Sequence, residues 1–128
     1  KFVQKKFLFS NWPRFTPQSC ISLEKNYAKK IFKILKIKKY PTVWLDFRIA
    51  TVSFLHFKQI NIYDKYLTYY RQLNNSASKK YKTMSKNWWI RRNEAHEFFS
   101  NISKKLNVKN RATLDKVSTK LINIFINE

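Results

Sequence analysis

The chain has 128 residues, and none of them is glycine. Glycine serves tight hairpin turns, phosphate-cradling loops and dinucleotide-binding turns, where the backbone takes a positive φ or approaches a ligand closely. Helices do not need it. The missing glycine therefore favours a mainly α fold, a small helical domain with an extended basic N-terminal arm. It also argues against the RNA-recognition and KH folds, whose motifs contain glycine.

Apolar residues spaced by three and four predict helices along most of the chain. The last of these helices has an expected core face of Leu114, Val117, Leu121, Ile124 and Phe125. The third helix has an alternative start at Asn93, which would place Glu94 and Glu97 in its first turn. The expected ranges and N-caps are 22–39 with Ser22, 61–73 with Asn61, about 86–106 with Ser85, and about 111–126 with Asn110.

Residues 42–58 are ambiguous between helix and strand. Their β-branched and aromatic residues favour a strand, which would make the fold α+β with one or more strands in 42–58. The run is longer than a usual strand of about five or six residues, and no glycine or proline divides it. We therefore expect a helix, with a face of Leu45, Ile49, Val52 and His56.

The N-terminal residues differ from the rest. Pro13 and Pro17 exclude a helix interior or a central strand there, so residues 1–21 are expected to form an extended arm with Trp12 among its aromatic anchors. Residues 22–128 then form a single helical domain with a polar loop near 74–85. The lone cysteine, Cys20, is expected to be a small buried hydrophobic residue that forms no internal disulfide.

The charge is strongly one-sided, with 27 lysines and arginines against 7 acids and a formal net charge of +20. An A+T-rich genome, such as an organellar one, accounts for lysine in place of arginine but not for the scarcity of acids. Positive charges at this density repel one another unless a polyanion lies beside them, and nucleic-acid phosphate is the most common one.

Basic and aromatic residues alternate most closely between Lys79 and Arg92, where cations can neutralise phosphates and tryptophan can stack on unpaired bases. The arm and the face of helix 22–39 add further cations. The predicted RNA-binding residues are Lys5, Lys6, Arg14, Lys29, Lys33, Lys36, Lys79, Lys80, Lys82, Lys86, Trp88, Arg91 and Arg92.

No pattern of catalytic or metal-binding residues stands out. His96 and Glu97 match the start of a zinc-protease helix, but Ser100 stands where the second histidine belongs. We expect no enzymatic activity, catalytic residue, metal, cofactor or small-molecule substrate. The chain has no apolar run long enough for a transmembrane segment.

These features together predict a structural component of a large ribonucleoprotein. The first expectation is a mitochondrial ribosomal protein of the matrix that contacts ribosomal RNA and neighbouring ribosomal proteins; another organelle or a cytosolic ribonucleoprotein is the alternative location. A second hypothesis is an accessory subunit of an organellar membrane complex, with the lysine-rich helix 22–39 facing lipid or a partner. A DNA-binding protein or a toxin-like cationic protein is a third.

Overall fold

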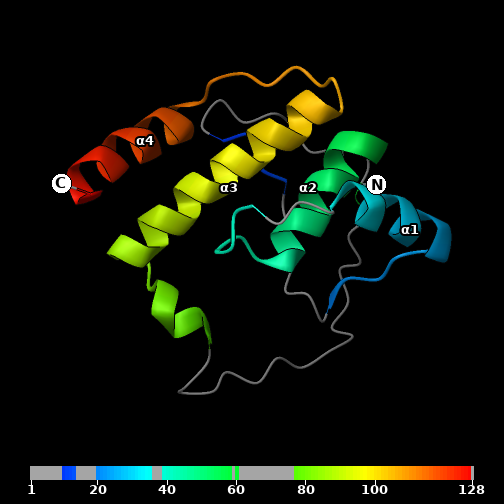
Figure 1. The fold of residues 1–128 in the computed structure, drawn as a ribbon, viewed down its shortest axis with the longest axis horizontal. Helices are drawn as coiled ribbons and strands as arrows, with labels where there is room; N and C mark the ends of the chain where they lie inside the picture. Colours follow the sequence, from blue (N-terminus) through cyan, green and yellow to red (C-terminus); the bar gives the residue numbers. More distant parts are fainter. Residues whose placement is uncertain (1–9, 14–19, 36–38, 59, 61–76, 128) are drawn as a thin grey trace.

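The computed structural model describes residues 10–13, 20–35, 39–58, 60 and 77–127. Within these ranges the chain forms four α-helices, one 3-10 helix and no strand (Figure 1). The expected mainly α fold is confirmed, and the strand alternative for 42–58 is wrong. The elements are α1 (Lys25–Ile34), α2 (Leu45–Phe57), the 3-10 helix η2 (Ala77–Tyr81), α3 (Lys86–Lys105) and α4 (Leu114–Asn127).

Helix α3 is the centre of the arrangement. It contacts α2, α4 and η2, while α1 packs against α2 (Figure 1). In Figure 1, α4 lies along one side of α3, and α2 and α1 lie toward the other. The longest helix thus joins parts that are far apart in the sequence.

The hydrophobic core lies between α1, α2 and α3. Its most deeply buried side chains are Phe98 and Ile102 of α3, Val52 of α2 and Ile31 of α1, all 1% exposed or less. Tyr40, just before α2, packs its ring edge-on against Phe98 at 6.0 Å. Helix α4 supplies no residue to this core among those that the structure describes.

Helix α1 is shorter than expected at the N-terminus. It begins at Lys25 after an N-cap at Glu24, so the prediction of Ser22 as the cap is wrong. The helical stretch ends at Ile34, well before Pro41, and the Nζ of Lys105 donates a hydrogen bond to the Ile34 carbonyl. A lysine of α3 thus satisfies one of the carbonyls that a helix end leaves without a partner.

Helix α2 is hydrophobic on most of its sides. Ile49 and Val52 are buried as expected, but Leu45 is 37% exposed and His56 is also exposed, so that half of the predicted face is wrong. The residues that complete the buried face are Phe47, Ala50, Thr51 and Leu55.

The start of α3 is as the sequence predicts. The Ser85 hydroxyl accepts a hydrogen bond from the Trp88 amide, which confirms the cap and rules out the start at Asn93. For α4 the predicted cap at Asn110 is wrong. Thr113 caps it instead: its Oγ1 accepts from the Lys116 amide, and its carbonyl accepts from the Val117 amide.

Helix α4 packs on α3 with the opposite side from the one that the sequence predicts. Its predicted core face is exposed to solvent, whereas its polar side is buried. Asp115 and Thr119 are 3% and 0% exposed, and the amide of Asn123 donates to the Trp89 carbonyl of α3. Polar side chains of α4 therefore face α3, where the Asp115 carboxylate pairs with the Arg92 guanidinium.

Trp12 is confirmed as an anchor because its ring packs at 5.1 Å from that of Phe47, and Pro13 is buried. The polar loop near 74–85 contains the helix η2. Cys20 is exposed, so the prediction that it is buried is wrong. The expected helix over 61–73 and its Asn61 cap lie outside the described residues.

Left-handed backbone positions are filled by residues other than glycine. Tyr40, Lys58, Met84 and Asn107 all have φ between 53° and 70°. Such a conformation costs a residue with a Cβ roughly 1–2 kcal/mol. A glycine-free chain therefore makes its turns at a cost in stability, and packing has to offset that cost.

Met84 offers a direct test, because its side chain is 66% exposed and its φ is 67°. We expect Met84→Gly to unfold at higher denaturant than Met84→Ala, by about 1 kcal/mol of unfolding free energy, since only glycine takes this φ without strain. The alanine variant controls for loss of the methionine side chain. Equal stability of the two variants would mean that the position is not left-handed.

Candidate nucleic-acid interface

Four exposed lysines gather where η2 meets the start of α3. We call this group the basic corner: Lys79, Lys80, Lys82 and Lys86. The Asn87 side-chain amide donates to the Lys80 carbonyl at 3.3 Å, which ties η2 to the first turn of α3. The positive end of the α3 dipole lies at the same place. The corner therefore combines four exposed cations with a helix end that favours anions.

Arg91 holds the basic corner in position. Its guanidinium carbon lies 4.0 Å from the ring centre of Trp44 and 4.1 Å from that of Tyr81, so the cation packs against both aromatic rings. Tyr81 is the last residue of η2, and Trp44 immediately precedes α2. Burial lowers the pKa of Arg91 from its usual value, with the charge of Asp46 opposing the change.

Arg92 makes a separate set of contacts on the neighbouring side of α3. Its Nε donates to Asp115 Oδ1 at 2.9 Å, and a second guanidinium nitrogen contacts the same oxygen. The guanidinium also stacks against Trp12 and Trp88, with its carbon 4.5 and 4.8 Å from their ring centres. Arg92 thereby links the N-terminal segment, α3 and α4.

An aromatic cavity of about 180 Å³ lies between these two arginines. Its size is comparable to the roughly 150 Å³ of a cavity that accepts a benzene ring. Ring faces and guanidinium groups together suit a flat, electron-rich group such as an unpaired base. The lining residues are Trp12, Val43, Trp44, Phe47, Trp88, Arg91, Arg92 and Ala95.

His96 is buried beside Asp115, with Nε2 3.2 Å from Oδ2. Burial lowers the pKa of His96 to about 4; the Asp115 carboxylate opposes this decrease, while Arg92 and Lys116 add to it. The imidazole is therefore neutral at pH 7. Asp115 consequently serves one formal cation, Arg92, and not two.

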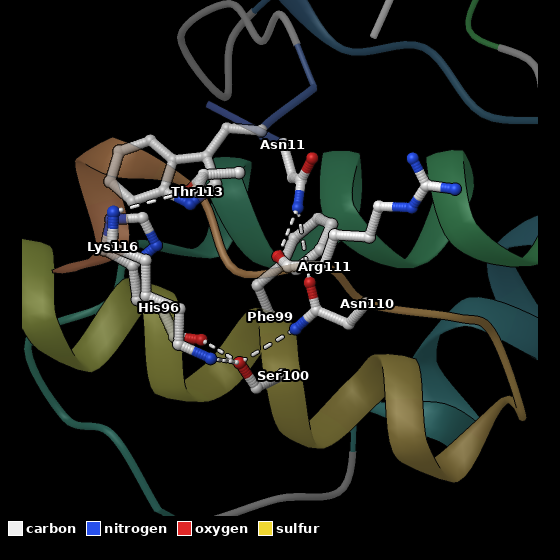
Figure 2. Close-up of a pocket in the computed structure, with 9 residues that line it drawn as sticks. Asn11, His96, Phe99, Ser100, Asn110, Arg111, Thr113 and Lys116 are labelled. Atoms are coloured by element: carbon white, nitrogen blue, oxygen red, sulfur yellow. Dashed lines mark hydrogen bonds between the residues drawn. The ribbon is translucent and has the colours of Figure 1, made fainter. Parts of the chain in front are cut away.

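A second, much smaller cavity lies where the N-terminal segment crosses α3 and the connection to α4 (Figure 2). At about 10 Å³ it has room for a single water molecule. Ser100 lies at its base: the hydroxyl donates to the His96 carbonyl and accepts from Asn110 and Lys116 (Figure 2). Asn11 donates to Asn110 and to the Arg111 carbonyl. The hydrogen bonds around this cavity connect the three segments, and the cavity itself is too small for a ligand.

The predicted RNA-binding residues do not form one patch. Lys29 and Lys33 are exposed on α1, which Figure 1 shows on a different side of the molecule from η2. Trp88 is half-buried and packs edge-on against Trp89 at 4.6 Å. The remaining predicted residues, Lys5, Lys6, Arg14 and Lys36, lie outside the described residues.

The sequence reasoning missed the roles of Trp44 and Tyr81. Tyr81 sits in the basic-aromatic run, but nothing in the sequence connects it with Trp44, 37 positions earlier. Their rings meet edge-on at 6.0 Å, because α2 and η2 both pack on α3. Arg91 and Arg92 were the clearest candidates for phosphate contact in the sequence, yet in the structure both are engaged in contacts within the molecule.

The described part of the chain offers neither a metal site nor a membrane-spanning helix. No group of three or more histidine, cysteine, aspartate or glutamate side chains there could hold a metal ion. None of the helices there is both long enough and apolar enough to cross a membrane.

Comparison with known proteins identifies no relative. The chain matches no protein-family model, no curated protein and no solved structure.

The His96 environment predicts how stability depends on pH. Its folded-state pKa, about 4, is below the ordinary 6.5, so the unfolded chain takes up the proton first as the pH falls. The stabilisation is complete above about pH 6.5 and is lost between there and pH 4, by roughly 3 kcal/mol at most.

We expect His96→Gln to remove this part of the pH dependence in denaturant unfolding at pH 4 to 8. His56→Gln, at an exposed histidine of α2, is the matched control and should follow the parent curve. Parallel curves for the parent and His96→Gln would show that His96 is not a buried neutral imidazole.

Proposed function

We propose that this protein is a structural RNA-binding component of a large ribonucleoprotein. The assembly we expect is a mitochondrial ribosome, in which the protein would contact ribosomal RNA and neighbouring ribosomal proteins in the matrix. Its task would be to neutralise packed phosphates and to join adjacent parts of the assembly, without catalysing a reaction.

The observation that carries this proposal is where the acidic side chains lie in the fold. Among the described acids, Asp46 and Asp115 are buried, and Glu94 accepts hydrogen bonds from the amide and hydroxyl of Thr42. Of the acids that the structure describes, only Glu24 and Glu97 are exposed. The chain thus places most of its few described acids in its own interior contacts and presents an excess of lysine to solvent.

That distribution matches the chemistry of folded RNA. Exposed lysines can neutralise phosphates and release their condensed counterions without an ordered geometry, which supplies affinity but little sequence specificity. The aromatic cavity beside the basic corner adds a place where an unpaired base could stack next to two guanidinium groups. Affinity from lysines and positioning from aromatic rings are what a scaffold on structured RNA requires.

The accessory-subunit hypothesis remains the alternative. Its support is α1, on which Lys25, Lys29, Lys30 and Lys33 are exposed beside the outward-facing Phe32. A basic helix with an apolar residue among its lysines also suits an anionic lipid surface. This hypothesis accounts less well for the basic corner, which lies on another part of the molecule.

The basic corner predicts a defined salt dependence. We expect the triple variant Lys79→Glu, Lys80→Glu, Lys82→Glu to bind a labelled ribosomal RNA hairpin with an unpaired loop at least about tenfold more weakly. The slope of log affinity against log salt should become shallower by about 2, because each lost phosphate contact contributes about 0.7.

The control has the same change in net charge at exposed lysines elsewhere: Lys58→Glu, Lys104→Glu, Lys109→Glu. It should lose clearly less affinity. Equal losses in the two triple variants would show that total charge, and not the basic corner, governs binding.

Membership of a ribonucleoprotein is tested by sedimentation of native extract on a density gradient, with and without RNase, followed by mass spectrometry for this chain. Co-migration with a ribosomal subunit that RNase abolishes is the expected result. Migration with a detergent-solubilised membrane complex, unchanged by RNase, would reject the proposal in favour of the accessory-subunit hypothesis.

A further inference from the structure

Helix α4 presents its apolar side to solvent. Five large hydrophobic side chains along it are between 49% and 75% exposed. The opposite side is fastened to α3 by Asp115 and Asn123, so α4 cannot turn these residues inward without breaking those contacts. We call the exposed residues the α4 stripe: Leu114, Val117, Leu121, Ile124 and Phe125.

The spacing of the stripe indicates what shape would cover it. Leu114, Val117, Leu121 and Ile124 follow one another at intervals of three, four and three, which is the pattern of a helix that packs along another helix. A contiguous apolar row on the surface of a soluble domain marks an interaction site more often than an accident of composition. The stripe therefore fits an apolar row on a partner helix.

A second copy of this chain is a poor occupant. Two molecules of charge +20 repel each other. A 14-residue helix is about 21 Å long, and one such stripe buries far less than the roughly 800 Å² per partner of a standard interface. The partner must hold the protein through other contacts as well, as a neighbour in a larger assembly does.

The charges around the stripe point to an acidic partner. Lys120 lies next to the stripe on α4, and Lys109 and Arg111 are exposed just before the helix. The acid within the described part of α4, Asp115, is buried and bound to Arg92. A helix with Asp or Glu beside its apolar row would gain from these cations, and one with Lys would be repelled.

A lipid surface fits less well. Helices that lie on membranes carry many lysines and arginines along their polar face. The polar side of α4 is instead packed on α3, where Lys116 donates to Ser100, and Lys120 is the exposed cation on the described part of the helix. One exposed lysine on the described part of α4 can pair with an acidic side chain of a partner helix, but it is far short of the row of cations with which interfacial helices hold an anionic bilayer.

We propose that the α4 stripe docks an amphipathic helix of a neighbouring protein, with acidic residues on both sides of its apolar row. The inference rests on the proposed function in that this neighbour belongs to the same assembly. It specifies where that protein contact lies, on a different helix from the basic corner.

The test uses the full-length chain and a labelled three-heptad peptide helix with leucine at the a and d positions and glutamate at e and g. Anisotropy titrations are run to high protein concentration, because the stripe alone gives a weak complex, and at about 150 mM salt, to limit unspecific attraction. We expect Leu121→Ser with Phe125→Ser to weaken peptide binding at least tenfold without change of charge. Phe32→Ser, at an exposed apolar residue of α1, is the matched control and should leave binding unchanged.

Two further peptides separate charge from fit. A peptide with lysine at e and g should bind at least tenfold more weakly than the acidic one, and so should an acidic peptide with serine at a and d. Equal binding of the acidic peptide by the parent and the double variant would overturn the proposal. A circular-dichroism spectrum and a melting curve of the double variant confirm that it is folded.

The other occupants are outcomes of the same experiment. A dimer in sedimentation equilibrium that the double variant abolishes would assign the stripe to a second copy. Binding to phosphatidylcholine–phosphatidylserine vesicles that the double variant abolishes would assign it to lipid. Either result would overturn the proposal.

The same variants separate this inference from the proposed function. The α4 double variant should bind the RNA hairpin like the parent. If peptide binding fails while RNA binding depends on the basic corner, only the inference about the stripe is wrong. If the peptide binds the stripe but the basic-corner variant keeps full RNA affinity, the RNA-binding role is the part that fails.

Discussion

The contact between Asp115 and Arg92 sets how α4 lies on α3. It draws the polar side of α4 onto α3, and the same guanidinium stacks on Trp12, which fastens the N-terminal segment over the same helix. A buried ion pair is costly unless its groups are well satisfied. Here the two aromatic rings and the neutral His96 surround it, and the hydrogen-bond network around Ser100 closes the joint on one side.

This use of Asp115 has a consequence for the surface. In a chain with so few acids, each one that is buried in a structural contact leaves the outside more positive. Asp46 is buried near the start of α2, and Glu94 accepts a hydrogen bond from Thr42 in the turn before that helix. Both contacts also leave the outside more positive. The interior contacts that stabilise the fold therefore also create the excess of exposed lysine on which the proposed RNA-binding role depends.

The sequence predicted local features well where short-range chemistry decides them. The Ser85 cap and the helix within 42–58 follow from capping and from the absence of turn residues. The caps at Ser22 and Asn110 failed because neighbouring residues, Glu24 and Thr113, occupy the positions just before α1 and α4. At the candidate site, the sequence placed Lys79, Lys80, Lys82 and Lys86 in one basic stretch, and the structure leaves all four exposed. The packing of Arg91 against Trp44 and Tyr81 was not predicted, since it joins residues that only packing brings together.

By itself, the sequence determined the composition-level properties: a glycine-free helical chain with a net charge of +20 and few acids to balance it. It also predicted a helix over about 111–126 with one apolar face, which the structure has at Leu114–Asn127. Which side faces inward was decided only by the tertiary structure. Periodicity shows that a helix has two faces, but the choice depends on what the neighbouring helix offers. Helix α3 offers an arginine and a buried histidine that an acid can satisfy, so the polar side is buried and the apolar side is left for a partner.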